Sequence, residues 1–316
     1  MGLKSGLRDL GEYFGRRPTD YYHSRPEVAY DPNDPLPYYL DQRQRADYDG
    51  PTDDDNVPLY AAGGNLTRLP VHITLWALGQ LEHYRRDGQQ DRLEKCRPAL
   101  DWLVKSQTDD GAWLSEVPMK RYRLEGSWRS AMAQGLAIST LLRAAHLRAG
   151  DRDYYVASAI KALGPFHKDV AHGGVTTYHE AGPFYEEYPC RPSCHVLNGF
   201  IFALWGLYDL VRFENNDEAR LLWKNGLETL RAWLPQYDLG YWSLYQLPRK
   251  PRNPATVPYH ELHVKQLAVM FQITGEPIFG EYSHKWESYL GHRYNALHTL
   301  PAKLVWLAGL DRTPKE

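Results

Sequence analysis

The 316-residue chain has little sulfur and no strong excess of charge of either sign. Its three cysteines, Cys96, Cys190 and Cys194, are too few for a disulfide framework. A bridge or a metal pair at Cys190 and Cys194 is conceivable, but no second Cys/His pair with zinc spacing accompanies them, so we expect packed thiols and no metal. The formal net charge of −2 excludes a global basic field, and we expect no nucleic-acid partner.

Long apolar runs are also missing. No stretch approaches the roughly 18 apolar residues that a membrane span needs. Residues 1–17 lack the continuous apolar core of a signal peptide. The default expectation is therefore a cytoplasmic protein with no membrane span, and nothing in the sequence resembles a nucleotide-binding fold.

Aromatic side chains, in contrast, are abundant, with 10 tryptophans and 23 tyrosines. Flat rings stack on the faces of sugars, and phenols hydrogen-bond to sugar hydroxyls. The same side chains also fill large cores, which is the commoner reason for their presence. Composition alone therefore does not establish a carbohydrate site.

The chain changes character near residue 58. Residues 1–58 are polar, rich in proline, aspartate and tyrosine, and carry little helical periodicity. The tyrosines at 21, 22, 30, 38 and 39 favour an arm that packs on the protein over a free tail. We therefore expect an N-terminal arm at 1–58 and a helical domain at 59–316.

Helical periodicity dominates after residue 70. Apolar residues recur on one face after Pro70, and Ser130 is a suitable helix cap. The segment 196–210 is apolar almost all round, which predicts a buried helix. The predicted helices cover about 70–81, 93–103, 130–141, 153–163, 196–210, 217–233, 259–273, 277–290 and 296–309.

Short glycine-containing turns separate the predicted helix pairs. They lie at 107–113, 173–178 and 237–242, and their glycines are roughly 65 residues apart. Repetition at such a period is typical of repeated helical hairpins. We predict an all-α fold, an α/α toroid with short β-hairpins at one end; an open α-solenoid is the alternative.

Two segments carry residues suited to acid–base chemistry. Residues 185–189 (YEEYP) place two carboxylates beside two phenols, although a solvated polar loop is the alternative. Residues 259–263 (YHELH) resemble a zinc-protease motif, but His260 and His263 are three residues apart instead of four. Hydrogen bonding or packing is an equal alternative to a binding role for these two histidines.

These segments belong to a longer series that resembles the D-glucuronyl C5-epimerase family, the heparosan-N-sulfate glucuronate 5-epimerases. The resemblance covers about residues 57–290. Its clearest segments are 130–135 (SAMAQG), 185–189, 196–200 (VLNGF), 205–210 (WGLYDL), 234–238 (LPQYD), 244–245, 259–260 and 286–290 (WESYL). Animal members carry a large β-rich region between the positions of Tyr84 and Leu93, where this chain has about eight residues. The resemblance therefore implies a minimal, microbial form.

The resemblance implies an isomerase that converts D-glucuronic acid to L-iduronic acid residues in a heparosan or heparan sulfate-like polysaccharide. The reaction removes the C5 proton and returns one from the opposite face, which needs two acid/base groups and no cofactor. Glu187 and Tyr259 are the implied pair. Tyr188 and Tyr245 would orient the uronate or assist proton transfer.

The family pattern places an arginine three residues after the tyrosine that matches Tyr245. Pro248 stands there in this chain, and Arg249 follows it. Arg249 is therefore the candidate for the substrate carboxylate. Five further residues are substrate-binding candidates: His260, His263, Trp128, Gln134 and Asn198. A homodimer is left open.

Three rival functions also fit the sequence. A uronate lyase removes the same proton and then expels the C4 oxygen. The segment from Gln107 through Gly111 to Trp113 matches a repeat of triterpene cyclases, but it occurs here without their acid motif. A polysaccharide-binding homologue without activity is the third.

Overall fold

The computed structural model describes residues 26–62, 64–247, 252–292 and 294–307. It divides into two compact units. Of these residues, the larger unit comprises those in 26–193 and 199–230, and the smaller unit comprises 194–198 and those from 231 to 307. Each unit is described by itself below.

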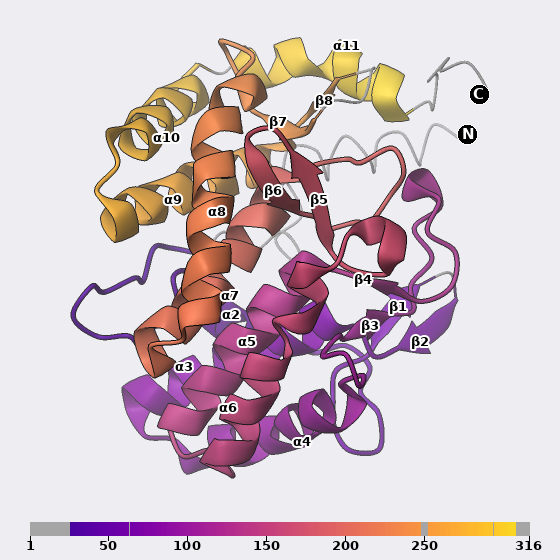
Figure 1. Ribbon diagram of the computed structural model, residues 1–316, viewed down its shortest axis with the longest axis vertical. Helices are drawn as coiled ribbons and strands as arrows, with labels where there is room; N and C mark the ends of the chain where they lie inside the picture. The colour runs from indigo at the N-terminus through magenta and orange to yellow at the C-terminus, as the bar shows by residue number, and fades with distance from the viewer. Residues whose placement is uncertain (1–25, 63, 248–251, 293, 308–316) are drawn as a thin grey trace. The chain divides into compact units, whose positions relative to one another are not determined.

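The larger unit is mainly helical (Figure 1). Helix α3 packs against α2, α4 and α5, and α5 packs against α6. Its elements are α2 (Arg43–Ala46), β1 (Tyr60–Ala62), β2 (Asn65–Thr67), α3 (Pro70–Asp87), α4 (Gln90–Ser106), β3 (Leu114–Ser115), β4 (Trp128–Arg129), α5 (Ala131–His146), α6 (Arg152–Lys161), β5 (Thr176–His179) and β6 (Gly182–Tyr185).

Two long helices, α7 (Leu197–Glu214) and α8 (Asp217–Trp233), have most of their length in the larger unit. The smaller unit contains β7 (Leu244–Gln246), β8 (Asn253–Pro254), α9 (Val257–Thr274), α10 (Pro277–Leu290) and α11 (Asn295–Leu307). Helix α9 packs against α10. The helices predicted from the sequence are confirmed, most with ends within a few residues of the expected ones.

Local sequence signals explain where the helices begin and end. Pro70 occupies the first turn of α3, and the Ser130 side chain accepts a hydrogen bond from the Ala133 amide at the start of α5. Gly88 ends α3 in the left-handed conformation with φ of 66°. Helix α7 is buried as predicted, with Phe200 and Ile201 at 0 % exposure.

The glycine turns lead into short hairpins. Gly111 has φ of +89°, and a Cβ there would collide with the Lys161 carbonyl oxygen, so only glycine fits. Strands β3 and β4 pair after this turn, β5 pairs with β6, and β7 pairs with β8, all antiparallel. The expected small hairpins are thus confirmed, and the toroid remains a prediction.

The described part of the arm belongs to the core of the larger unit. Tyr38, Tyr39 and Leu40 are fully buried. The Tyr39 ring stacks on Trp205 of α7 with centroids 4.6 Å apart. Tyr21 and Tyr22 lie outside the described residues, and the boundary at residue 58 remains a prediction.

No helix in the described ranges combines the length and the apolar character that a bilayer crossing requires. All three cysteines are buried thiols, as expected.

Candidate active site

The adjacent glutamates after β6 have different surroundings within the larger unit. The Glu186 amide donates to the Val175 carbonyl at 2.7 Å, and its carbonyl accepts from the Ala131 amide at 2.9 Å. Its carboxylate Oε1 accepts a hydrogen bond from the Thr177 hydroxyl at 2.9 Å. Because Glu186 is fully buried among these bonds, it is a structural residue that fixes the course of the segment.

Glu187 lies against the beginning of α7. Its side chain is 6 % exposed, and a Cβ on Gly199, in the first turn of α7, would collide with Glu187 Oε2. Glycine at 199 therefore leaves room for the carboxylate beside the first turn of α7. The alternative of a solvated polar loop at 185–189 is wrong, because both glutamates are buried.

Tyr188 joins an aromatic group beside Glu187. Its half-buried ring stacks on Tyr122 at 4.3 Å between centroids and lies 5.5 Å from Trp128. The Trp128 indole donates a hydrogen bond to the Val117 carbonyl at 2.8 Å, which fixes its orientation. Three aromatic rings are therefore brought together by β4, the 3-10 turn Lys120–Tyr122 and the segment after β6.

Two further candidates meet in the smaller unit. Tyr259 is half-buried in the first turn of α9, and Tyr245 is 8 % exposed on β7. Their rings pack edge to face with centroids 4.9 Å apart. The structure thus pairs two phenols that are separated by fourteen positions, one of them at a helix N-terminus.

The two histidines of α9 form a buried network with Ser243. His260 Nε2 donates to the Trp286 carbonyl at 2.9 Å, so its Nδ1 is an acceptor for the Ser243 amide at 3.2 Å and hydroxyl at 2.7 Å. Ser243 Oγ then accepts from His263 Nδ1 at 2.9 Å. Of the roles left open for His260, hydrogen bonding within the protein is the one that the structure supports.

Burial keeps both imidazoles neutral. It lowers the pKa of His260 to about 4 and the pKa of His263 well below its ordinary value. The Trp242 ring stacks on His260 with centroids 3.8 Å apart and helps to exclude water. These histidines are therefore hydrogen-bonding groups in the interior of the smaller unit, and neither is charged at neutral pH.

Two other substrate-binding candidates have contacts within the protein. The side-chain Nε2 of Gln134 donates to the backbone carbonyls of Gly111 and Ala162, and its Oε1 accepts from the backbone amide of Trp113. Since Gln134 is also fully buried, we assign it a structural role in holding the first glycine turn. The Asn198 carbonyl accepts from the Gln266 side chain at 3.1 Å. Arg249 lies outside the described residues.

Sequence reasoning missed Tyr122 and Ser243. Tyr122 lies 66 positions before Tyr188, and no periodic pattern joins them. Ser243 directly follows a glycine turn, but only the fold reveals its contact with both histidines. In the described part of the chain, no group of three or more His, Cys, Asp or Glu side chains is arranged to hold a metal ion.

Each unit, taken by itself, thus holds a group of a type that can take part in proton transfer. The larger unit holds a buried carboxylate beside an aromatic group that a sugar ring could stack on. The smaller unit holds a phenol pair and, on the same helix as Tyr259, two neutral imidazoles. A carboxylate and a phenol are both able to exchange a proton with an activated C–H group.

Comparison with known proteins adds independent information. Residues 107–288 match the family model described as D-glucuronyl C5-epimerase C-terminus. The chain is 34 % identical over 258 residues to the D-glucuronyl C5-epimerase of Caenorhabditis elegans, and the aligned region covers 75 % of this chain and 41 % of that protein. It is 30 % identical over 178 residues to the "Uncharacterized protein MJ1128" of Methanocaldococcus jannaschii, which covers 55 % of this chain and 56 % of that protein. The chain therefore spans well under two thirds of either relative.

Proposed function

Because the chain belongs to the D-glucuronyl C5-epimerase C-terminal family, we propose that it is an isomerase acting on uronic acid residues within a polysaccharide. It converts D-glucuronic acid to L-iduronic acid residues by removing and replacing the C5 proton. A heparosan or heparan sulfate-like polymer is the proposed substrate, as the sequence resemblance implies.

The burial of the Glu187 carboxylate is the observation that best supports this proposal. A buried carboxylate beside Gly199 of α7, adjacent in sequence to aromatic Tyr188, is suited to hold or deliver a proton in a water-poor site. In the proposed mechanism, Glu187 acts on one face of the uronate ring and Tyr259 on the other. One group takes the C5 proton while the other donates a proton to the opposite face.

The remaining residues position the substrate. Tyr188 and Trp128 offer ring faces for stacking on the sugar, and Tyr245 orients Tyr259 through their edge-to-face contact. Arg249 is the proposed partner of the substrate carboxylate, whose charge must be neutralised as electron density moves onto it. The reaction exchanges protons only, so no redox group is needed.

A deuterium-exchange experiment tests the proposal. The protein is incubated in heavy water with a panel of glucuronic acid polymers, and the C5 position is followed by NMR. Deuterium at C5 together with iduronic acid, without chain cleavage, is the expected result. An unsaturated, cleaved product would mean a lyase instead, and the lack of any exchange across the panel would contradict catalysis.

A further inference from the structure

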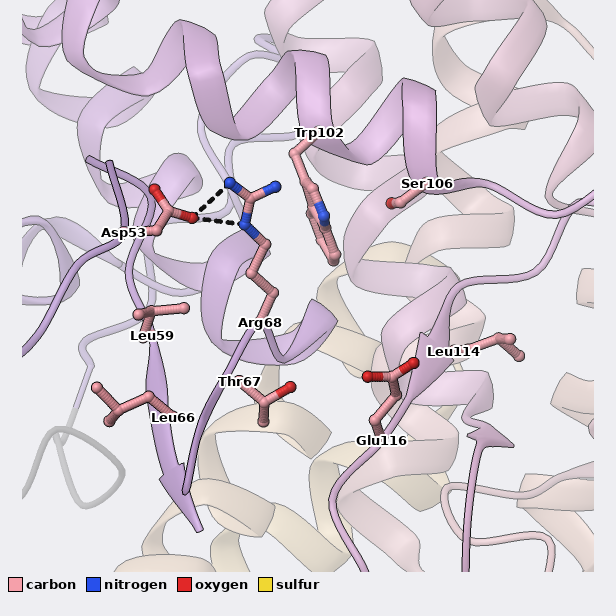
Figure 2. Close-up of a pocket in the computed structure, with 9 residues that line it drawn as sticks. All are labelled: Asp53, Leu59, Leu66, Thr67, Arg68, Trp102, Ser106, Leu114 and Glu116. Atoms are coloured by element: carbon pink, nitrogen blue, oxygen red, sulfur yellow. Dashed lines mark hydrogen bonds and ion pairs between the residues drawn. The ribbon is translucent and has the colours of Figure 1, made fainter. Parts of the chain in front are cut away.

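The larger unit contains a cavity of about 500 Å³ that none of the candidate catalytic residues lines. Figure 2 shows side chains from β2, α4 and the β3 segment around it. The volume is in the range of small-molecule pockets. Apolar walls come from Leu59, Leu66 and Leu114, and polar groups come from Thr67, Arg68, Ser106 and Glu116.

An aromatic and a cationic side chain share one side of the cavity. The Arg68 guanidinium lies over the Trp102 ring, 5.9 Å from its centroid. Nε and Nη2 of Arg68 are held by the Asp53 carboxylate, each at 2.5 Å. No described residue bonds to Nη1 of Arg68, so this nitrogen remains a donor for a ligand.

A hydroxyl on the cavity wall also lacks a partner. Ser106 lies one turn after Trp102 on α4, and its buried Oγ makes no hydrogen bond within the described residues. A buried polar atom without a partner is unfavourable, and a ligand hydroxyl would satisfy it. Trp102 and Ser106 together therefore offer a ring face and a hydrogen-bonding group on one helix.

The charges of the cavity select against an anion. Asp53 and Glu116 contribute two carboxylates, whereas Arg68 is the one basic side chain among the lining residues that the structure describes. Asp53 already neutralises the guanidinium. A carboxylate-bearing ligand would add a further negative charge, whereas a neutral or aminated one would not.

The cavity is connected to the candidate active site through the hairpin β3–β4. Glu116 lies between Ser115, which pairs with Trp128, and Val117, whose carbonyl accepts from the Trp128 indole. Trp128 in turn contacts Tyr188. All of these residues belong to the larger unit.

We propose that this cavity is a subsite for a pyranose ring without a carboxylate, a neutral or amino sugar further along the polymer whose uronate is processed. This inference rests on the proposed function for the identity of the polymer. The sugar's apolar face packs on Trp102, and its hydroxyls bond to Arg68 Nη1, Ser106 Oγ and Glu116.

Ligand-observed NMR titrations with three monosaccharide probes test the subsite without any catalysis. The probes are the methyl glycosides of glucose, glucosamine and glucuronic acid. At low ionic strength we expect the first two to bind roughly tenfold more tightly than the glucuronide. Equal or tighter binding of the glucuronide would overturn the charge argument.

Variants locate the binding in this cavity. Trp102→Ala weakens binding of the glucoside by about tenfold, whereas the matched change Trp223→Ala on α8 leaves it unaltered. Glu116→Gln, at an exposed position that should not disturb folding, reduces the discrimination against the glucuronide. Unchanged affinity in Trp102→Ala and unchanged discrimination in Glu116→Gln would each overturn the proposal.

Activity measurements separate this inference from the proposed function. With an active wild-type protein, Trp102→Ala raises KM for the polymer and leaves kcat unchanged; an unchanged KM would overturn the subsite and leave the epimerase proposal standing. If the wild type catalyses no C5 exchange, the proposed function fails. The monosaccharide titrations still decide whether the cavity binds sugar.

Discussion

Arg143 of α5 and Asp209 of α7 form a fully buried ion pair, with Nη1 2.6 Å from Oδ2 and side-chain exposures of 1 % and 0 %. Burial alone opposes the charge on Arg143, but Asp209 outweighs this effect and raises the pKa of Arg143. Arg143 also donates to the carbonyls of Pro35, Leu36 and Pro37. This pair therefore fastens the arm to the helices of the larger unit.

Replacing Arg143 by methionine should lower the free energy of unfolding by about 3–5 kcal/mol, because Asp209 is left as an uncompensated buried charge. Denaturant titration measures the loss. Arg152→Met is the control: Arg152 pairs with Glu214 but is 51 % exposed, so its loss should stay below about 1 kcal/mol. Equal effects of the two changes would contradict the structural role of Arg143.

Because His260 is buried and neutral, we expect the free energy of unfolding to fall on mild acidification. An unfolded histidine takes up a proton near pH 6.5, whereas burial lowers the pKa of folded His260 to about 4. Between these values the unfolded state binds more protons, so stability is lost as pH falls through this window. The full loss is on the order of 3 kcal/mol for His260.

Denaturant titrations at several pH values measure this slope. Burial opposes the charge on Asp110, but hydrogen bonds from Thr108 and Lys168 outweigh this effect and lower the pKa of Asp110 to about 2. Asp110 therefore affects stability only at lower pH. The two effects are therefore separable. His260→Gln should flatten the slope between pH 6.5 and 4; an unaltered slope would mean that His260 is not the responsible group.

The two adjacent glutamates allow a matched test of catalysis. Glu187→Gln should reduce C5 exchange by about 10²–10⁴-fold, because an amide cannot transfer the proton. Glu186→Gln keeps an oxygen for the Thr177 hydroxyl and should retain activity within about threefold. Circular dichroism and thermal unfolding check that both variants fold. Loss of activity in the Glu186 variant alone would reverse the assignment.

Gly199 should act through Glu187. Alanine at 199 places a Cβ against Glu187 Oε2, so the carboxylate must move and kcat should fall. In a Glu187→Gln background the same alanine should have little further effect, because the displaced group no longer reacts. Additive losses in the double variant would show that Gly199 acts by another route.

Much of the helical framework follows from the sequence, because its signals are local. Apolar periodicity predicts the helices themselves. Pro70 and the Ser130 cap each lie at the start of the helix that they mark. The glycine turns are equally local, since Gly111 and Gly173 have positive φ values that favour glycine.

Contacts between distant segments were not predictable in this way. The Arg143–Asp209 pair joins residues 66 positions apart, and the cavity brings Arg68 to Trp102 and Glu116. Similarly, nothing in the segment YEEYP indicates which glutamate is bonded to Thr177 and which faces α7. Those distinctions depend on packing between elements, for which the single sequence holds no pattern.

We propose that Glu187 and Tyr259 exchange protons with C5 from opposite faces of the ring. The most direct test compares glucuronate-rich and iduronate-rich polymers in heavy water, with the wild type, Glu187→Gln and Tyr259→Phe. The wild type should label and interconvert both epimers, and neither variant should produce the inverted epimer. Inversion at the wild-type rate by either variant would contradict the claim.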